Sequence, residues 1–545
     1  MRDHAVLYLN GQRAEIRGPD LLLPLSTWLR ERRRLTGTKV MCAQGDCGSC
    51  TVLVGRHEDP ADAGLTYRAI ASCIGFVFQA DRAHVVTVEG LKEADGSLSA
   101  VQRALVDGHG SQCGFCTPGF AAAIHAEHEQ RGRVAAAELT VGGAAGRTAW
   151  AGALCGNLCR CTGYLQILDA AGSVDPATLT RMNDRHPPAG MLSAFAEAAA
   201  TPLDARFEDG GRARRVVAPH TLEDAAAFKA GHPGCRVAAG ATDLGVQLRR
   251  GRFDPGEVLG LSAVGGFGRV EREDAGGGRR RLVIGAGATW AAVARAVERE
   301  LPALSELLVR FGSPQVRNAG TVGGNLAHAS PVADALPPLL ALDAELELIA
   351  ETGTTPVSPA DDLAGKGAAG GEKGVVPVFR RRRVPLTGFY TGHKRTALRP
   401  EELIAAVRVP LPTPAQRLCL HKASRRRDVD TATASAAVLL EFEDPAEAGA
   451  VGARLRGARV ALGGVAATAL RVPAAEDSLA GARFTEDALR AAGRLARAAV
   501  DPISDARGSA AHRSRLCENL LVKSFHQIAT AAVAAPGRTN REALA

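Results

Sequence analysis

A chain of 545 residues is too long to fold around one hydrophobic core, so three or four domains are expected. Its formal charge of +8 comes from 66 basic and 58 acidic residues dispersed along the chain, which argues against a nucleic-acid-binding surface. The N-terminus lacks the apolar core of a secretion signal, and no later segment is apolar enough to span a bilayer. We therefore expect a cytoplasmic protein without membrane or nucleic-acid partners.

The N-terminal region has the pattern of a small sheet with one helix. Residues 5–17 alternate apolar and polar side chains around Asn10-Gly11, a dipeptide typical of two-residue hairpin turns. An amphipathic helix is expected over 25–35 and a short strand over 51–54. This order of hairpin, helix, loop and strand is similar to that of a ferredoxin β-grasp domain.

The pattern becomes helical from about residue 91. Thr117-Pro118 favours a helix start, because threonine can cap a helix and proline suits its first turn. We expect that helix to run to about Arg131, with free N–H groups at its start that favour an anionic group. The stretch 132–153 is rich in alanine and glycine and is expected to loop out, in a length compatible with a second helix pair.

The remainder of the chain predicts two further units. Residues 171–212 have few apolar patterns and are interpreted as a linker. The stretch 350–383, rich in glycine, lysine and arginine, is expected to be an exposed loop, and strands over 436–442 and 459–462 alternate with helices. The fold class is therefore α+β multidomain, with units at 1–90, 91–170, 213–412 and 415–535 and the linker at 171–212.

Eight cysteines near the N-terminus form two sets of four. Nine of the twelve cysteines precede residue 162, and without a secretion signal such clustered thiols bind metal more often than they form disulfides. The first set reads C-x4-C-x2-C with a distant fourth cysteine, the spacing of a plant-type [2Fe-2S] ferredoxin. A four-cysteine zinc site is the alternative, but it usually pairs two short C-x2-C hooks. The candidate ligands are Cys42, Cys47, Cys50 and Cys73 in the first set, and Cys113, Cys116, Cys159 and Cys161 in the second.

The second set combines C-x2-C with C-x-C. Because each set could hold one cluster, two clusters in one chain predict an electron relay. Cys155 lies four residues before Cys159 and is an alternative ligand, although the C-x-C pair is preferred. 

Two glycine-rich turns lie in the middle of the chain. The first, Val237–Leu244, follows a predicted strand, and the second is Thr321–Asn325. Small residues let backbone N–H groups approach a pyrophosphate closely, although either turn by itself is also compatible with an ordinary turn. Gly285-x-Gly287 lacks the third glycine and the downstream acid of a Rossmann fingerprint and is interpreted as a strand-end turn.

These motifs, in this order, resemble the iron-sulfur and flavin portions of the xanthine dehydrogenase family of molybdenum hydroxylases. The most specific stretches are CAQGDCGSC, QCGFCTPGF, GNLCRCTGY and FGSPQVRNAGTVGGNLAHASPVAD. KASRRRDVD at 422–430 and DARGSAAHR at 505–513 are similar to the family's flavoprotein C-terminal domain. The resemblance implies a β-grasp ferredoxin domain, a helical [2Fe-2S] domain, an α+β FAD-binding domain and an α+β flavoprotein C-terminal domain.

The resemblance also implies roles for individual residues. The two glycine-rich turns would hold the FAD diphosphate and ribose, and Gln112 matches a residue that touches the partner's molybdopterin. Position 241 is alanine where many relatives have glycine or asparagine, and the loop before Cys159 looks longer than usual. Phe311 would lie at the flavin ring, Asp334 would hydrogen-bond the cofactor, and Lys422 would lie near the isoalloxazine. The implied FAD-binding residues are Val237, Ala238, Ala239, Gly240, Ala241, Thr242, Asp243, Leu244, Phe311, Thr321, Val322, Gly323, Gly324, Asn325, Asp334 and Lys422.

The chain ends after the flavin portion, so the resemblance implies a separate large molybdopterin-binding subunit and no catalytic residue on this chain. The expected protein is the small subunit of a xanthine dehydrogenase, assembled as a dimer of heterodimers. Electrons from hypoxanthine or xanthine would pass through the helical-domain cluster, the ferredoxin-like cluster and FAD to NAD+, since flavin accepts single electrons and delivers a hydride. The alternatives are the same subunit of another molybdenum hydroxylase, acting on an aldehyde or N-heterocycle, and a stand-alone redox carrier.

Overall fold

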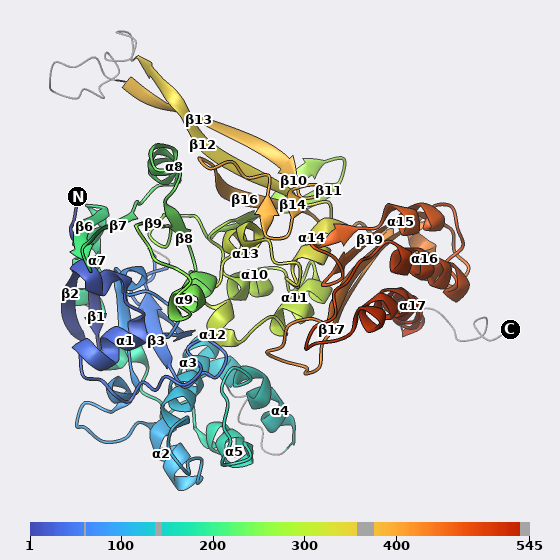
Figure 1. Ribbon diagram of the computed structural model, residues 1–545. Coiled ribbons are helices and arrows are strands. Elements are labelled where there is room, and N and C mark those ends of the chain that lie inside the picture. Colours follow the sequence, from blue (N-terminus) through green and yellow to red (C-terminus); the bar gives the residue numbers. More distant parts are fainter. Residues whose placement is uncertain (59–60, 137–143, 357–374, 535–545) are drawn as a thin grey trace.

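The computed structural model describes residues 1–58, 61–136, 144–356 and 375–534, shown in Figure 1. Its first unit is a five-stranded sheet in the order β2-β1-β5-β3-β4. The predicted hairpin is confirmed, because Asn10 and Gly11 have φ values of 48° and 84° and join β1 to β2. The predicted helix over 25–35 ends early, as α1 (Leu25–Thr27) followed by a π-helical turn over Trp28–Arg32. The strands are β1 (His4–Leu9), β2 (Gln12–Arg17), β3 (Thr51–Arg56), β4 (Thr66–Ala71) and β5 (Ala83–Val86).

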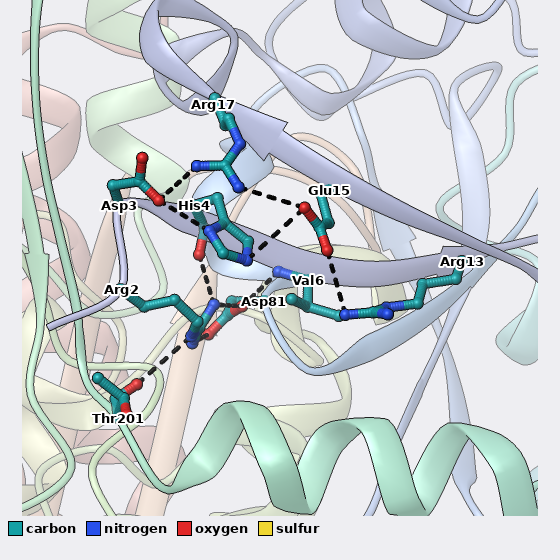
Figure 2. A network of polar contacts seen from close by, with 9 residues as sticks. All are labelled: Arg2, Asp3, His4, Val6, Arg13, Glu15, Arg17, Asp81 and Thr201. Atoms are coloured by element: carbon teal, nitrogen blue, oxygen red, sulfur yellow. Dashed lines mark hydrogen bonds and ion pairs between the residues drawn. The ribbon is translucent and has the colours of Figure 1, made fainter.

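Polar contacts hold the first strand against its neighbours (Figure 2). The Arg2 guanidinium forms two hydrogen bonds with the buried Asp81 carboxylate, at 2.9 and 2.8 Å. Asp81 also accepts from the backbone N–H of Val6 at 2.8 Å, and Arg2 donates to the carbonyl of Thr201 at 3.4 Å. The start of the chain is therefore joined to the segment that leads into the middle domain.

The second unit is helical. It contains α2 (Ala100–Asp107), α3 (Thr117–Ala136), α4 (Ala144–Ala153) and α5 (Leu165–Ser173). The predicted start of α3 at Thr117 is confirmed, although the Thr117 hydroxyl donates to the Ser111 hydroxyl at 2.8 Å. The expectation of a loop over 132–153 is wrong for 144–153, which forms α4, whereas 137–143 lie outside the described residues.

The segment expected to be a linker is structured. It forms α6 (Met182–Arg185), α7 (Ala189–Ala199) and β6 (Leu203–Asp209). Phe195 of α7 is buried and lies edge-on to Tyr8 of β1, with ring centroids 5.7 Å apart. Strand β6 pairs along its whole length with β7 (Arg212–Ala218), so the middle domain's first sheet begins inside the predicted linker. Strand β6 was missed because its outer half is charged and exposed.

Two main sheets build the middle domain, beside a two-stranded pair formed by Tyr390–Gly392 and Arg395–Thr396. The smaller has the order β6-β7-β9-β8, and the larger has the antiparallel order β10-β11-β16-β12-β13. Helices α9 to α13 lie between the first sheet and the C-terminal unit in Figure 1. The remaining strands are β8 (Arg236–Ala238), β9 (Glu257–Gly260), β10 (Val270–Gly276), β11 (Arg279–Gly285), β12 (Glu345–Pro356), β13 (Val375–Pro385), β14 (Tyr390–Gly392), β15 (Arg395–Thr396) and β16 (Leu403–Pro410). The helices are α8 (Leu222–Gly231), α9 (Thr242–Arg249), α10 (Trp290–Ala296), α11 (Pro302–Val309), α12 (Pro314–Arg317), α13 (Val322–His328) and α14 (Leu336–Ala341).

The expected loop over 350–383 is replaced at both ends by long strands. β12 and β13 form a hairpin that extends away from the rest of the chain (Figure 1), and residues 357–374 lie outside the described part. Two arginines of β13 are paired with carboxylates, Arg381 with Glu347 at 2.8 Å and Arg382 with Glu402 at 2.6 Å. The arginine run therefore belongs to a sheet edge, which its composition alone did not indicate.

The C-terminal unit is a four-stranded antiparallel sheet with three helices. Its strands β17 (Gln416–Ala423), β18 (Ala434–Phe442), β19 (Leu455–Gly463) and β20 (Leu470–Arg471) confirm those predicted over 436–442 and 459–462. The helices are α15 (Pro473–Leu479), α16 (Glu486–Ala498) and α17 (Ala510–Ala534). No helix in the described part of the chain is long and apolar enough to cross a membrane.

The hydrophobic cores cross the expected domain boundaries. One buried cluster joins the β-grasp sheet, through residues such as Leu7 and Phe78, to Leu203 and Ala238 of the middle domain. A second joins the other face of the β-grasp sheet to the helical unit. Because burial of this apolar surface stabilises both partners, the units hold one another in fixed positions.

Candidate cluster and flavin sites

The first cysteine quartet lies where the β-grasp sheet meets the middle domain. Cys42, Cys47 and Cys50 occupy the loop before β3, and Cys73 follows β4. Three of these thiols are buried, and Cys42 is half-buried. The structure thus brings together four cysteines that the sequence placed on one loop and one distant position.

The four thiols interact with one another. Hydrogen bonding to Cys47, and then to Cys73, lowers the pKa of the Cys42 thiol, whereas the bond to Cys42 raises the pKa of Cys47. In the same way, hydrogen bonding to Cys73 lowers the pKa of Cys50, and bonds to Cys42 and Cys50 raise the pKa of Cys73. The four sulfurs are therefore close enough to interact with one another, and binding of metal ions to the thiolates would release their protons.

The second quartet lies on the surface of the helical unit. The Cys161 and Cys113 sulfurs are 3.5 Å apart, and both residues are exposed. Cys159 is buried and Cys116 is half-buried; burial, followed by its interaction with Cys159, raises the pKa of Cys116 to about 12. In this quartet the sulfurs lie as two pairs, Cys113 with Cys161 and Cys116 with Cys159.

Cys155 lies apart from this quartet. Burial raises the pKa of its thiol, and its charged neighbours are Arg317 and Asp428 of the middle and C-terminal domains. By contrast, Cys161 lies beside Cys113 and Cys159 interacts with Cys116, so both cysteines of the C-x-C pair lie next to the C-x2-C motif. The structure therefore favours the C-x-C pair over Cys155 as the source of ligands.

The donor set fits a two-iron cluster. Among the described residues, no three or more His, Cys, Asp or Glu side chains surround one metal-ion position. Four thiolates arranged two by two are instead the ligands of a [2Fe-2S] cluster, in which each iron takes two sulfurs. Cys42, Cys47, Cys50 and Cys73 would hold one such cluster, and Cys113, Cys116, Cys159 and Cys161 would hold another.

Hydrogen bonds to the carbonyls of Cys47 and Cys73 connect the first quartet to both neighbouring units. The Leu158 N–H, beside Cys159, donates to the Cys47 carbonyl at 3.0 Å. On the other side, Arg249 at the end of α9 donates from Nε to the Cys73 carbonyl at 3.2 Å. The first quartet therefore lies between the second quartet and the helix that follows the first glycine-rich turn.

That turn presents a row of free backbone donors. It begins at β8, and Ala241, with φ of 53°, occupies the left-handed conformation immediately before α9. Within the described part of the chain, no protein group accepts a hydrogen bond from the N–H groups of residues 239–244. Unpaired N–H groups at a helix start suit a phosphate oxygen, so this turn fits the diphosphate of a dinucleotide. The left-handed φ explains why glycine or asparagine is favoured at position 241.

The second turn lies against the first. A Cβ on Gly240 would stand 2.1 Å from the carbonyl oxygen of Ala319, which immediately precedes Gly320 and Thr321. The turn's own N–H groups are largely occupied, because Val322 and Gly323 donate to the carbonyls of Ala288 and Ala286 at 2.9 and 2.8 Å. Of the two turns, the first is therefore the one that presents free donors to a phosphate.

The Gly285-x-Gly287 segment has a role that the sequence interpretation missed. It ends β11, which confirms the predicted strand-end turn. Its neighbours Ala286 and Ala288 receive the hydrogen bonds that position the start of α13. No local signal indicated this role, because the partners are more than thirty residues apart.

Phe311, Asp334 and Lys422 converge at a second location. The Lys422 ammonium lies 2.8 Å from the Asp334 carboxylate and donates to the Arg310 carbonyl, next to Phe311, at 2.9 Å. Both side chains of the pair are buried, and burial raises the pKa of Asp334 against the opposing effect of Lys422. Phe311 is half-buried and lies 5.2 Å from the Trp290 ring.

The stretch 311–325 connects this location to the paired turns. Phe311 and the second glycine-rich turn therefore belong to one continuous segment of the middle domain.

Three family descriptions match the chain. They are the FAD binding domain in molybdopterin dehydrogenase over residues 211–369, the CO dehydrogenase flavoprotein C-terminal domain over 420–528, and the [2Fe-2S] binding domain over 87–172. The chain belongs to the molybdenum hydroxylase family. It contributes that family's iron-sulfur and flavin domains.

Individual members are similar at modest identity. Xanthine dehydrogenase of Drosophila subobscura is 28% identical over 80% of this chain and 33% of its own length. Xanthine dehydrogenase 1 of Arabidopsis thaliana is 26% identical over 92% of this chain and 38% of its own length. The chain thus spans about a third of the curated relatives it matches.

Solved structures of related enzymes also align with part of the chain. Carbon monoxide dehydrogenase from Hydrogenophaga pseudoflava aligns with a TM-score of 0.48 and 28% identity, over 58% of this chain and 96% of that one. Quinoline 2-oxidoreductase from Pseudomonas putida 86 aligns with a TM-score of 0.46 and 27% identity, over 58% of this chain and 96% of that one.

Proposed function

We propose that this chain is the iron-sulfur and FAD electron-transfer subunit of a xanthine dehydrogenase. It would take electrons from hypoxanthine or xanthine oxidation on a large molybdopterin-binding subunit and deliver them to NAD+. The observation that carries this proposal is the sequence of contacts from the second quartet, through Leu158 and Cys47, to Cys73, Arg249 and helix α9. A relay needs its centres held close together, and these contacts hold them.

The bound groups would supply one-electron chemistry at the clusters and hydride chemistry at the flavin. Backbone groups and side chains of this chain would bind and orient the clusters and the flavin. The N–H groups of 239–244 would donate hydrogen bonds to the diphosphate, Phe311 would lie against the flavin ring, and the Lys422 and Asp334 pair would fix a charge beside it. Burial of Cys47, Cys50 and Cys73 would exclude water from the first cluster.

The exposed side of the second quartet supports a partner at that surface. Three exposed apolar side chains follow these cysteines closely in the sequence. They are Phe115 after Cys113, and Tyr164 and Leu165 after Cys161, with exposed fractions of 40%, 37% and 54%. Exposed aromatic and aliphatic side chains of this kind are typical of the core of a protein interface. We propose that the large subunit covers this surface and that two such pairs assemble into a cytoplasmic heterotetramer.

Cofactor analysis of the purified chain tests the proposal. We expect two [2Fe-2S] EPR signals after reduction and one FAD per chain, and a preparation that binds only zinc would overturn the assignment. Cys47→Ser should abolish one signal and retain FAD. Cys155→Ser is the matched control and should retain both signals, because Cys155 faces Arg317 and Asp428.

Substrate and acceptor require the partner subunit. The co-purified complex should reduce NAD+ with xanthine, and its activities toward aldehydes and N-heterocycles, or with oxygen as acceptor, are the comparisons. We favour xanthine as the substrate because the chain is similar to xanthine dehydrogenases. Turnover by the isolated chain at the full physiological rate would favour a stand-alone redox carrier instead.

A further inference from the structure

Gln315 occupies the point where the three redox units meet. It lies on α12 of the middle domain, and its side chain is 1% exposed. Its amide Nε2 donates to the Thr51 hydroxyl at 3.2 Å and to the Asn157 amide oxygen at 2.8 Å. Thr51 directly follows Cys50, and Asn157 precedes Cys159 by two residues. One side chain of the flavin domain thus contacts both cysteine-bearing units.

These hydrogen bonds close into a ring. The Thr51 hydroxyl donates to the Gly48 carbonyl at 2.6 Å, and the Asn157 amide donates to the same carbonyl at 3.1 Å. The next contact along the two cysteine-bearing segments is the backbone hydrogen bond from the Leu158 N–H to the Cys47 carbonyl, at 3.0 Å. The ring therefore adjoins the hydrogen bond that joins Cys47 to Leu158, the residue before Cys159.

The ring is tightly packed at two glycines, Gly156 and Gly48. A Cβ on Gly156 would lie 2.1 Å from Gln315 Oε1, and a Cβ on Gly48 would lie 2.3 Å from the Gly156 carbonyl oxygen. Close packing of this kind does not deform gradually, so a change at Gln315 must be taken up by movement of the two cysteine loops. A surface hydrogen bond between domains would transmit no such constraint.

We propose that Gln315 is a positioning residue that fixes the separation and orientation of the two cysteine quartets. The inference rests on the proposed function, since it assigns the junction a purpose in electron transfer. With clusters bound at both quartets, one electron would pass from the second quartet's centre to that of the first, with no bond made or broken. The rate of that step depends on the separation that the ring maintains.

The test uses the full chain and two variants of the ring. Gln315→Met retains a similar side-chain length without a donor, and Asn157→Asp retains the acceptor for Gln315 but loses the donor to Gly48. Asn318→Ala is the matched control, because it removes a hydrogen bond to the Ala69 carbonyl, 2.9 Å long, that links the flavin domain to β4 alone. Asn318 lies three residues from Gln315, so both changes affect the same segment.

Hydrogen exchange of the Leu158 N–H is the first readout, because it reports opening of the junction without needing loaded cofactors. Loss of a buried donor should accelerate this exchange roughly tenfold to a hundredfold in both ring variants and leave the control unchanged. The magnetic interaction between the two reduced clusters in EPR is the second readout. It falls steeply with separation, so its splitting should weaken or broaden in both ring variants while iron and FAD contents stay constant.

Each outcome decides the inference. Unchanged exchange and unchanged splitting in Gln315→Met and Asn157→Asp would overturn it. If Gln315→Met does not fold, Asn157→Asp alone decides. If the unmodified chain lacks two EPR signals, the proposed function fails, and the exchange of Leu158 still shows whether Gln315 holds the junction.

Discussion

Gly245→Ala tests whether the first quartet and the flavin turn are held in register by direct backbone contact. Gly245 lies on α9, and a Cβ at this position would stand 2.0 Å from the Ile74 carbonyl oxygen, beside Cys73. Ordinary contact begins at 3.4 Å, so the helix and the Cys73 loop must separate by about 1.4 Å. Both partners are backbone, so no side-chain rotation relieves the clash.

The energetic effect follows from this displacement. Overpacking of a tight contact typically destabilises a protein by about 1–3 kcal/mol. Each kcal/mol lowers the thermal midpoint by roughly 2–4 °C for domains of this size. Gly152→Ala is the matched control, because Gly152 is also helical and a Cβ there meets nothing within 4 Å. That control should be stabilised by about 0.5–1 kcal/mol through helix propensity alone.

Two measurements separate the variants. Thermal unfolding reports the stability difference, and flash photoreduction of the flavin followed at iron-sulfur absorbance reports the rate of electron transfer to the first cluster. Gly245→Ala should have a lower thermal midpoint because of the clash. It should also transfer electrons more slowly, because electron tunnelling weakens with distance. If Gly245→Ala matches Gly152→Ala in midpoint and in rate, the close approach of α9 to Ile74 has no role in the relay.

Two further substitutions test buried charges. Lys422→Met should destabilise the chain by about 3–5 kcal/mol near neutral pH, because it leaves the buried Asp334 carboxylate unpaired. Burial raises the pKa of Asp334 in the folded state above its ordinary value of 3.8, so folding favours the protonated carboxyl. The loss of stability in Lys422→Met should therefore shrink as the pH falls toward 4 and Asp334 becomes neutral. An equal loss of stability at every pH would contradict this reasoning. Arg513→Met should lower the thermal midpoint strongly, since Arg513 donates to the Thr433 and Gly464 carbonyls at 2.8 and 2.6 Å and pairs with Asp505 at 2.6 Å. Midpoints within error of the unmodified chain would show that this buried ring of contacts is dispensable.

Local features were predictable because they depend on neighbouring residues. The Asn10-Gly11 hairpin, the start of α3 at Thr117 and the strands at 436–442 follow from turn chemistry, capping and apolar patterns within a few residues. The cysteine spacing identified the two sets of thiols that the structure gathers, since ligands on one loop are constrained by its length. The expected linker and the loop over 350–383 were wrong where strands rich in charged residues pair with the next strand along the chain.

The sequence by itself thus determined which residues are candidates for binding the clusters and the flavin, whereas the tertiary structure decided how those residues face one another. The position of Cys155 beside Arg317, the contact of Gly245 with Ile74, and the contact of Gln315 with Asn157 all join residues more than a hundred positions apart. No periodicity or turn signal encodes such pairs. They arise because shared hydrophobic cores bring three units together, and the hydrogen bonds form only after that packing has excluded water.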